Sequence, residues 1–470
     1  MTAGAATSDP RATNAAVEIL RSGGNAVDAA AAAAFVLYVV EPQSCGIGGD
    51  GFMLIHKGRG APVALDGSGA VPAALTPRVL AARGLPNVPS RGAQTATAPG
   101  AVALLETALA RGGTMRLADV VAPAKALAAG GFAVRPSLAE AARRAAETDA
   151  ASDPVLGPLY WPGGAPVSEG DVIVNPALAG ALDLIAASGS AALATGDLAQ
   201  SIAATVAAND GFLSVDDLAT HTTVEVAPLS VAFGDHVVWQ LPEPTQGPAV
   251  IAALAEIGPV DVPDWDQVYQ AVRTGMISAR FDPAEVGGPI SNAAKGDTTF
   301  IAVVDHDGAG ASLITSVFGD FGSHLGVPAL GGPIHNRATT FRIASYPLVP
   351  GKPPHTTIPG LVTTAHGDLA FVMGVAGGVM QPQAQVQLAL RILVEGLEPQ
   401  AALDAPRFKI CFGGELALEP GHPLLAAYPE AADKDPGPEG FGAAQVVGWH
   451  NGELSAGADR RRGGSAIVVA

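Results

Sequence analysis

The chain has 470 residues but few cysteines and few positive charges. Its two cysteines, Cys45 and Cys411, are too few for a disulfide framework and lack the Cys-x-x-Cys spacing of a metal site. We therefore expect no metal, and a reducing compartment is allowed. Only 26 Lys and Arg stand against 44 Asp and Glu, which gives a formal charge of −18. This acidic balance argues against nucleic acid or an anionic membrane as a partner.

Long hydrophobic runs are also absent. The longest apolar run, residues 29–40, is shorter than the roughly 20 residues of a membrane-spanning helix and is typical of a buried core helix. Residues 1–6 lack the basic and apolar regions of a signal peptide, so we expect a cytoplasmic protein.

Apolar and turn-forming residues, by contrast, are plentiful. Apolar residues make up 48% of the chain and charged residues 15%, which predicts a large buried core rather than disorder. The 58 Gly and 38 Pro are scattered without a period, so they indicate turns and close backbone approaches rather than collagen.

The order of helix and strand signals predicts an α+β sandwich. Helical patterns cover residues 10–20, 25–40, 101–111, 117–129, 137–148, 178–188 and 382–395. Strand patterns cover residues 52–56, 224–241, 299–305, 311–317, 361–364, 369–372 and, in the end of the chain at 445–470, two short segments around Asn451-Gly452. Residues 257–295 are polar and punctuated by Pro and Gly, which indicates a surface connector. The GxGGxG run at 46–51 precedes a strand, whereas a dinucleotide-binding fingerprint follows one, so we expect no nucleotide site there.

Asp297 and Thr298 stand between that connector and a strand that the sequence predicts to be buried. If the bond between them were cut, Thr298 would carry both a hydroxyl nucleophile and its own α-amino group as the base. One residue would then supply both groups of an N-terminal threonine hydrolase. The alternative interpretation is that Thr298 simply begins a strand, where threonine is common.

A series of short motifs runs in order along nearly the whole chain. They are Asn25-Ala26-Val27-Asp28-Ala29-Ala30, Gly48-Gly49-Asp50-Gly51-Phe52-Met53-Leu54-Ile55, Thr298-Thr299-Phe300, Phe321-Gly322-Ser323, Asn336-Arg337, Gly377-Gly378, Ala405-Pro406-Arg407-Phe408 and Gly457-Ala458-Asp459-Arg460. In order and spacing, this series resembles the gamma-glutamyltranspeptidase family.

The resemblance implies a four-layer αββα sandwich of the N-terminal-nucleophile hydrolase type, made as one chain that cuts itself between Asp297 and Thr298. Residues 1–297 and 298–470 would then be the two subunits of a heterodimer, which could itself pair with a second heterodimer. Thr298 would be the catalytic nucleophile and would form an acyl-enzyme with a small-molecule substrate, without a cofactor.

The resemblance also assigns roles around the nucleophile. Gly377 and Gly378 match the oxyanion hole, a task that suits glycine because its backbone can approach a ligand closely. Ser316 matches a family hydroxyl that holds the nucleophile. A plain tight turn remains the alternative for the two glycines.

The match fails where a gamma-glutamyl group would be bound. Binding a free α-carboxylate and α-ammonium requires an Arg and an acid. In the matching segments this chain has Ser68 at the Arg position and Thr340 at the acid position, while Thr356 and Thr357 keep the hydroxyls of the family's Ser-Ser pair. With both charges missing, we expect glutamate to be rejected.

The run Gln381-Pro382-Gln383 is similar instead to the family's oxamate-type amidohydrolases and cephalosporin-type acylases. The expected substrate is therefore an amide or acyl compound other than gamma-glutamyl, and Arg337 and His355 are candidates to bind its carboxylate or keto-acid group. Three alternatives stay open. One is removal of an oxalyl group by C–C bond hydrolysis, as in related proteins of actinobacterial pathways to alkylproline antibiotics. The others are an ordinary gamma-glutamyl hydrolase or transferase, and a non-catalytic binding scaffold.

Overall fold

Two antiparallel sheets form the centre of the structure, a computed structural model that describes residues 2–285, 296–349, 351–437 and 440–470. The first sheet has the strand order β19 (Ser465–Val469), β1 (Ala3–Thr7), β9 (Gly296–Val304), β10 (Gly310–Gly319), β2 (Asp50–His56), β3 (Val63–Asp66) and β6 (Val224–Val226). The second has the order β18 (Glu453–Ala458), β17 (Ala443–His450), β14 (Leu369–Ala376), β13 (Pro359–Thr364), β8 (His236–Gln240) and β7 (Leu229–Phe233).

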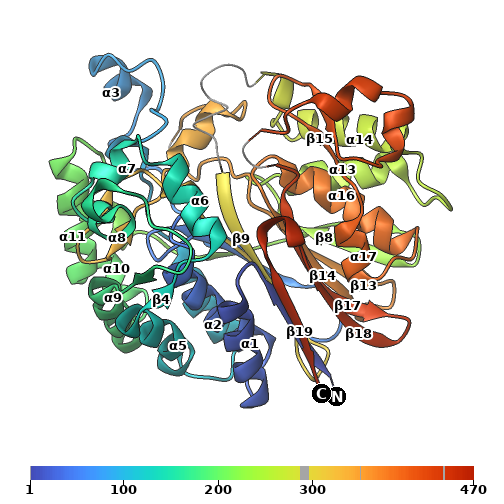
Figure 1. Ribbon diagram of the computed structural model, residues 1–470, viewed down its shortest axis with the longest axis horizontal. Coiled ribbons are helices and arrows are strands. Elements are labelled where there is room, and N and C mark those ends of the chain that lie inside the picture. The colour runs from blue at the N-terminus through green and yellow to red at the C-terminus, as the bar shows by residue number, and fades with distance from the viewer. Residues whose placement is uncertain (1, 286–295, 350, 438–439) are drawn as a thin grey trace.

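Helices cover the outer face of each sheet and complete the four-layer αββα sandwich, which confirms the predicted fold class (Figure 1). On the first sheet lie α1 (Pro10–Arg21), α2 (Ala26–Val40) and α4 (Ala101–Gly112), with α5 (Leu117–Gly130), α6 (Pro136–Arg144) and α9 (Pro176–Ser188) in the same half. On the second lie α13 (Gly247–Ile257), α14 (Trp265–Ser278), α16 (Met380–Leu393) and α17 (Pro399–Asp404).

Shorter elements connect these layers. They are α3 (Pro77–Ala82), α7 (Asp149–Ser152), α8 (Leu156–Tyr160), α10 (Ala191–Ala194), α11 (Asp197–Ala208), α12 (Val215–Ala219), the two-residue strands β4 (Phe132–Ala133), β5 (Val172–Ile173), β11 (Gly326–Val327) and β12 (Gly332–Pro333), and the hairpin of β15 (Phe408–Ile410) with β16 (Leu416–Leu418).

Alternating side chains of β9 belong to two different cores. Phe300 and Ala302 pack between the sheets, whereas Ile301 and Val303 pack against the helices behind the first sheet. Thr298 is two residues before Phe300, and side chains two residues apart on a strand point to the same face. The Thr298 side chain therefore points toward the second sheet. The nucleophile candidate therefore faces the interior of the sandwich.

The apolar run at residues 29–40 forms most of α2, and every one of the 15 residues of this helix is buried. Its start is fixed by a reciprocal cap. The Asn25 side chain accepts hydrogen bonds from the backbone N–H groups of Val27 and Asp28, and the Asp28 carboxylate accepts one from the N–H of Asn25. The prediction of a buried core helix is confirmed. No single helix within the described ranges is long and apolar enough to cross a membrane; α9 joined with the segment 191–208 reaches the length only as a pair bent by 114°.

The predicted surface connector at residues 257–295 is wrong over much of its length. It contains α14, which buries Trp265, Val268 and Met276 in the core of the second sheet's helices. These apolar residues recur at helical spacing, but the polar residues between them concealed the helix. Residues 286–295 lie outside the described part of the chain.

Other boundaries also differ from the sequence patterns. The helix predicted over residues 137–148 ends at Arg144. The strands at the two ends of the chain, β1 and β19, were not predicted; β1 consists of Ala, Gly and Thr, which carry little strand signal. They pair with each other beside β9, so both termini support the central sheet.

The contact of Gly374 with the Phe300 ring tests the packing between the sheets. A Cβ on Gly374 would lie 2.4 Å from a ring carbon of Phe300. We expect Gly374→Ala to lower the free energy of unfolding by about 1–3 kcal/mol, because the ring has to move in a filled core. Gly180→Ala is the matched control: no atom lies within 4 Å of its added Cβ on α9, so it should be neutral or stabilising by about 0.5–1 kcal/mol. Urea unfolding of both variants measures the difference, and equal stabilities would contradict the packing.

Candidate active site

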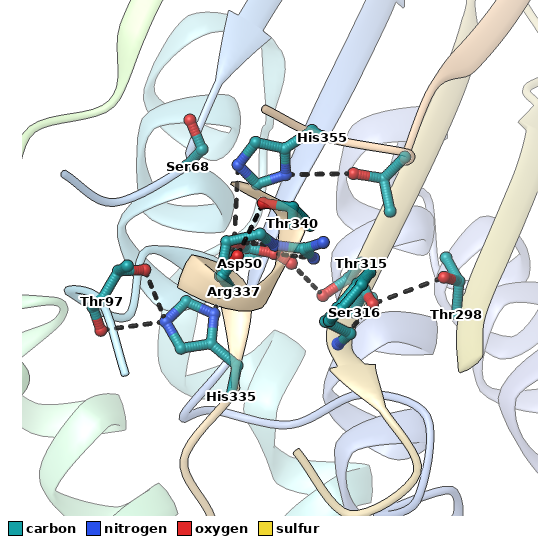
Figure 2. Close-up of polar contacts among 12 residues, drawn as sticks. Asp50, Ser68, Thr97, Thr298, Thr315, Ser316, His335, Arg337, Thr340 and His355 are labelled. Carbon is teal, nitrogen blue, oxygen red and sulfur yellow. Dashed lines mark hydrogen bonds and ion pairs between the residues drawn. The ribbon is translucent and has the colours of Figure 1, made fainter. Parts of the chain in front are cut away.

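Thr298 lies near the start of β9 and its side chain is buried. Its hydroxyl donates a hydrogen bond to Ser316 Oγ on β10 at 3.4 Å, and Ser316 Oγ also accepts one from the backbone N–H of Phe318 at 2.8 Å. The β9–β10 register shifts between Thr315 and Phe318, which is a bulge. Figure 2 shows Thr298 and Ser316 pointing toward each other from these neighbouring strands. The structure therefore brings together the predicted nucleophile and the predicted hydroxyl that holds it.

The turn after this bulge is strained and is held in place by residues 336 and 337. Phe318 has a φ of 72°, a left-handed conformation that is unfavourable for a bulky side chain. Its ring lies 5.0 Å from the guanidinium carbon of Arg337. The next backbone N–H, that of Gly319, donates to Asn336 Oδ1 at 2.9 Å. The family motif Asn336-Arg337 thus fixes the end of β10, where Ser316 meets Thr298.

A buried cluster of charged and imidazole groups lies on the other side of Ser316, which pairs with Asp50 in the β10–β2 ladder. The Asp50 carboxylate accepts two hydrogen bonds from Arg337, from Nε at 2.9 Å and from Nη2 at 2.7 Å. His335 Nδ1 and His355 Nε2 lie 3.3 Å and 3.8 Å from Oδ2 of Asp50. All four side chains are fully buried.

The charges in this cluster are set by burial and by Arg337. Burial opposes ionisation of Asp50, but the Arg337 guanidinium outweighs it and holds the pKa of Asp50 well below its usual range. Burial, followed by the positive charge of Arg337, holds the pKa of His355 well below its usual range. At neutral pH the cluster therefore contains an ionised Asp50, a charged Arg337 and a neutral His355.

Three nitrogens of the cluster have no hydrogen-bond partner among the residues that the structure describes. They are Nη1 of Arg337, Nε2 of His355 and Nδ1 of His335, and the two imidazole nitrogens lie within 4 Å of the Asp50 carboxylate. The other ring nitrogen of His355 lies 3.4 Å from Thr357 Oγ1, and the ring packs edge-on against Phe52 at 4.8 Å between centroids. Buried polar atoms are nearly always paired, so neighbouring unpaired nitrogens such as Arg337 Nη1 and His355 Nε2 are suited to bind a group from outside the protein.

Ser68 and Thr340, which stand where the family has the Arg and the acid that bind glutamate, make hydrogen bonds to nearby residues. Ser68 donates to Asp66 Oδ1 from its backbone N–H at 2.8 Å and from its hydroxyl at 2.5 Å. Lys352 Nζ lies 2.9 Å from Oδ2 of Asp66, the carboxylate that accepts from Ser68. Thr340 donates from its hydroxyl to the backbone carbonyl of Arg337 at 2.7 Å. Neither Ser68 nor Thr340 offers a charge to a substrate.

Thr356 and Thr357 are buried and are positioned by two glutamines of α16. The next residue, Ile358, donates from its N–H to Gln381 Oε1 at 2.9 Å and accepts at its carbonyl from Gln385 Nε2 at 2.9 Å. Residues four apart lie on one face of a helix. The Gln381-Pro382-Gln383 motif therefore contributes, through Gln381, to holding the segment that carries His355 and the two threonines.

Gly377 and Gly378 form the turn from β14 into α16, with φ values of 130° and 50° that favour glycine. Their carbonyls accept from the N–H groups of Met380 and Gln381, as in the first turn of a helix. Because N–H and C=O of one trans peptide point in opposite directions, the N–H of Gly378 points out of the helix N-terminus. Such a donor can bind a developing negative charge.

The direction of β14 places this turn at the same end of the sandwich as Thr298. Two close contacts show this direction. A Cβ built on Gly310, at the far end of the β9–β10 hairpin, would meet Leu369, and a Cβ built on Gly374 would meet Phe300. β14 therefore runs from Leu369, opposite the far end of β9, toward the end at which β9 begins.

The sequence patterns did not identify three residues of this site. These three residues are Asp50, His335 and Thr97. Asp50 is the counter-charge of Arg337, and His335 Nε2 lies 3.0 Å from Thr97 Oγ1 and 2.9 Å from the Thr97 carbonyl oxygen. A usable signal existed for Asp50 alone, since an acidic residue between glycines at the start of an apolar strand requires a buried partner. In the described part of the chain, no three His, Cys, Asp or Glu side chains are placed to hold a metal ion.

Comparison with known proteins gives one consistent family. The gamma-glutamyltranspeptidase family model matches residues 12–267 and 263–469. The oxamate amidohydrolase proenzyme of Klebsiella pneumoniae is 30% identical over 440 residues, which cover 84% of this chain and 83% of that protein. The acylase ACY 1 proenzyme of Pseudomonas sp. strain SE83 is 29% identical, with 90% and 84% covered.

Solved structures agree with this result. The crystal structure of cephalosporin acylase from Bacillus halodurans superimposes with a TM-score of 0.88 at 30% identity, over 99% of this chain and 95% of that one. With the family model matching nearly the whole sequence and the four-layer sandwich around Thr298 matching an acylase, the chain belongs to the gamma-glutamyltranspeptidase family of N-terminal-nucleophile hydrolases.

Proposed function

We propose that this protein is a self-processing amide hydrolase that cuts itself between Asp297 and Thr298 and then cleaves an acyl group other than gamma-glutamyl. The observation that carries the proposal is the position of Thr298. Its hydroxyl contacts Ser316, and Ser316 pairs with Asp50, which binds Arg337. The relatives that are acylases and an amidohydrolase support the same reaction type.

In the proposed reaction, Thr298 Oγ1 attacks the substrate carbonyl carbon and its proton passes to the α-amino group freed by processing. The carbonyl oxygen takes the negative charge and is stabilised by the N–H of Gly378 at the start of α16. Collapse of this intermediate breaks the C–N bond, and the leaving amine takes the proton. Water then hydrolyses the acyl-Thr298 ester by the same route in reverse. Ser316 orients the hydroxyl during both steps.

The acyl group in this proposal carries a carboxylate or a keto-acid group at its far end. Arg337 Nη1 is positively charged, buried and unpaired within the described residues, and His355 Nε2 beside it is unpaired as well. A carboxylate binds such a pair of nitrogens with charge-assisted hydrogen bonds. A free α-ammonium, by contrast, would meet the charge of Arg337 with no acid at Thr340 to balance it.

Self-processing is the first prediction. A denaturing gel of the purified wild type should show two fragments, residues 1–297 and 298–470, and Thr298→Ala should leave one intact chain because it lacks the attacking hydroxyl. Thr299→Ala is the matched control: its hydroxyl lies on the opposite strand face, 2.6 Å from Ser8 Oγ, so the chain should still be cut. A single intact band from an active wild-type preparation would contradict the mechanism.

Substrate choice is the second prediction. Gamma-glutamyl-4-nitroanilide and glutaryl-4-nitroanilide differ only in the α-ammonium group, for which Thr340 provides no charge. We expect kcat/KM for the better of succinyl- and glutaryl-4-nitroanilide to exceed that for the gamma-glutamyl compound by at least about a hundredfold, since a buried ammonium without a partner is strongly rejected. Release of nitroaniline measures both rates. Efficient turnover of the gamma-glutamyl compound would overturn the proposed specificity.

The role of Arg337 is the third prediction. Arg337→Lys keeps the positive charge that Asp50 needs but removes the unpaired Nη1. We expect kcat/KM for the carboxylated anilide to fall about ten- to a hundredfold, while kcat/KM for acetyl-4-nitroanilide changes by less than about threefold. Arg342→Lys is the control. It replaces another arginine of the same short helix, residues 337–342, whose side chain donates to the Val88 carbonyl rather than to Asp50. Equal losses on both substrates would show a structural role for Arg337 instead.

A further inference from the structure

A cleft of about 800 Å³ beside the candidate active site is lined by an unusual number of arginines. The helical half contributes Arg135, Arg143 and Arg144, and the segment after β18 contributes Arg460, Arg461 and Arg462. The whole chain has only 26 Lys and Arg and a formal charge of −18. Nearly a quarter of the positive side chains therefore line this cleft, against three acidic ones, Glu140, Glu169 and Asp320.

Some of these arginines hold the walls of the cleft. Arg135 Nε lies 3.4 Å from Asp9 Oδ2, and Arg144 Nη2 lies 3.0 Å from Asp320 Oδ2. Arg461 pairs with Glu419 and also with Asp459. These ion pairs fix the two sides of the cleft relative to the sheet and leave the more exposed arginines to face solvent.

Arg143 and Arg460 are the two most exposed arginines of the lining. The Arg143 side chain is 61% exposed and pairs with Glu140 one turn earlier on α6. The Arg460 side chain is 78% exposed and lies 3.5 Å from Asp404. Exposed pairs of this kind contribute little to stability, so both guanidinium groups can turn to a ligand at little cost.

Two residues of the cleft lining neighbour the candidate active site. Gly442 lines it, and a Cβ on Gly377 would lie 3.0 Å from the Cα of Gly442. Asp320, also in the lining, follows Gly319, which pairs with Gly296 at the start of β9. The ion pair between Arg144 of α6 and Asp320 also ties α6 to this end of the first sheet.

The cleft and Arg337 lie on opposite sides of the nucleophile. In the first sheet, β9 stands between β1 and β10. Arg337 binds Asp50 on β2, beyond β10, whereas Arg135 binds Asp9, the second residue after β1. A substrate whose acyl group reaches Arg337 therefore extends its other end toward the arginines.

We propose that this cleft binds the leaving-group side of the substrate and that this side carries carboxylate groups; the inference rests on the proposed function of Thr298. The arginines recognise the carboxylates by charge-assisted, bidentate hydrogen bonds. Within a strongly acidic protein, the cleft also gives an anionic amine a local site of favourable potential. The substrate is thus an amide with negative charge at both ends.

Direct binding of a leaving-group analogue tests the cleft without turnover. The probe is 5-aminoisophthalate, an arylamine with two carboxylates, titrated by calorimetry into the processed wild-type protein and into the double variant R143Q/R460Q. We expect the double variant to bind at least about tenfold more weakly, and wild-type binding to weaken as the salt concentration rises. The neutral diamide, 5-aminoisophthalamide, should bind no better to the wild type than to the variant.

The control variant is R116Q, which removes the arginine just before α5. Its side chain is 82% exposed and pairs with Asp119 three residues away, as Arg143 pairs with Glu140. It should bind the dianion like the wild type. Absence of dianion binding, or equal binding to the wild type and R143Q/R460Q, would overturn the inference while the fragment pattern and anilide turnover still support Thr298. A third outcome is also informative: R143Q/R460Q weakens dianion binding, but the protein neither cuts itself nor turns over any anilide. That result would overturn both the leaving-group role and the proposed function, and it would leave only an anion site.

Discussion

A buried ion pair between Asp50 and Arg337 connects the parts of the structure that form the reaction centre. Both side chains are fully buried, and removing either charge from such a pair costs about 3–5 kcal/mol because the other is left without a partner. Arg337 also lies under the strained Phe318, whose backbone N–H holds Ser316 Oγ. A continuous set of contacts therefore runs from the ion pair to Ser316 and then to the Thr298 hydroxyl. The position of the Thr298 hydroxyl therefore depends on a charge pair that no single strand could supply.

The same ion pair explains how one arginine can serve both structure and binding. Asp50 uses Nε and Nη2 of Arg337, and Nη1 stays unpaired within the described residues. The carboxylate neutralises much of the guanidinium charge, which makes its burial tolerable, while the remaining nitrogen keeps a directed donor. His355 stays neutral beside it because burial and the Arg337 charge both lower its pKa. The proposed function uses these two groups to bind a carboxylate, without the Arg and acid that hold a gamma-glutamyl group.

The acidic composition conceals an uneven distribution of charge. The formal charge of −18 argues against polyanionic partners for the surface as a whole. Around Thr298, however, the structure gathers cations on both sides: Arg337 in the interior and the arginines of α6 and of residues 460–462 in the cleft. Net charge describes the average surface, whereas recognition depends on the few groups that the fold brings to one place.

The fold was largely predictable because its signals are local or belong to family motifs. The residue patterns of α2, of the β9–β10 hairpin and of α16 each indicate helix or strand within the segment itself, without reference to the rest of the chain. Where the signal was weak, prediction failed: α14 hides its buried face among polar residues, and β1 is made of small residues whose burial is decided by β9 and β19.

The sequence by itself determined the family, the sandwich and the identity of Thr298, Ser316 and the glycine pair as candidates, because these follow from short motifs in a fixed order. Only the tertiary structure decided that Asp50 belongs to the site, that Arg337 has one unpaired nitrogen, and that arginines from residues 135 and 460 line one cleft. The reason is that electrostatic and hydrogen-bond partners are fixed by distances of a few ångströms between segments hundreds of residues apart, and no local pattern encodes those distances.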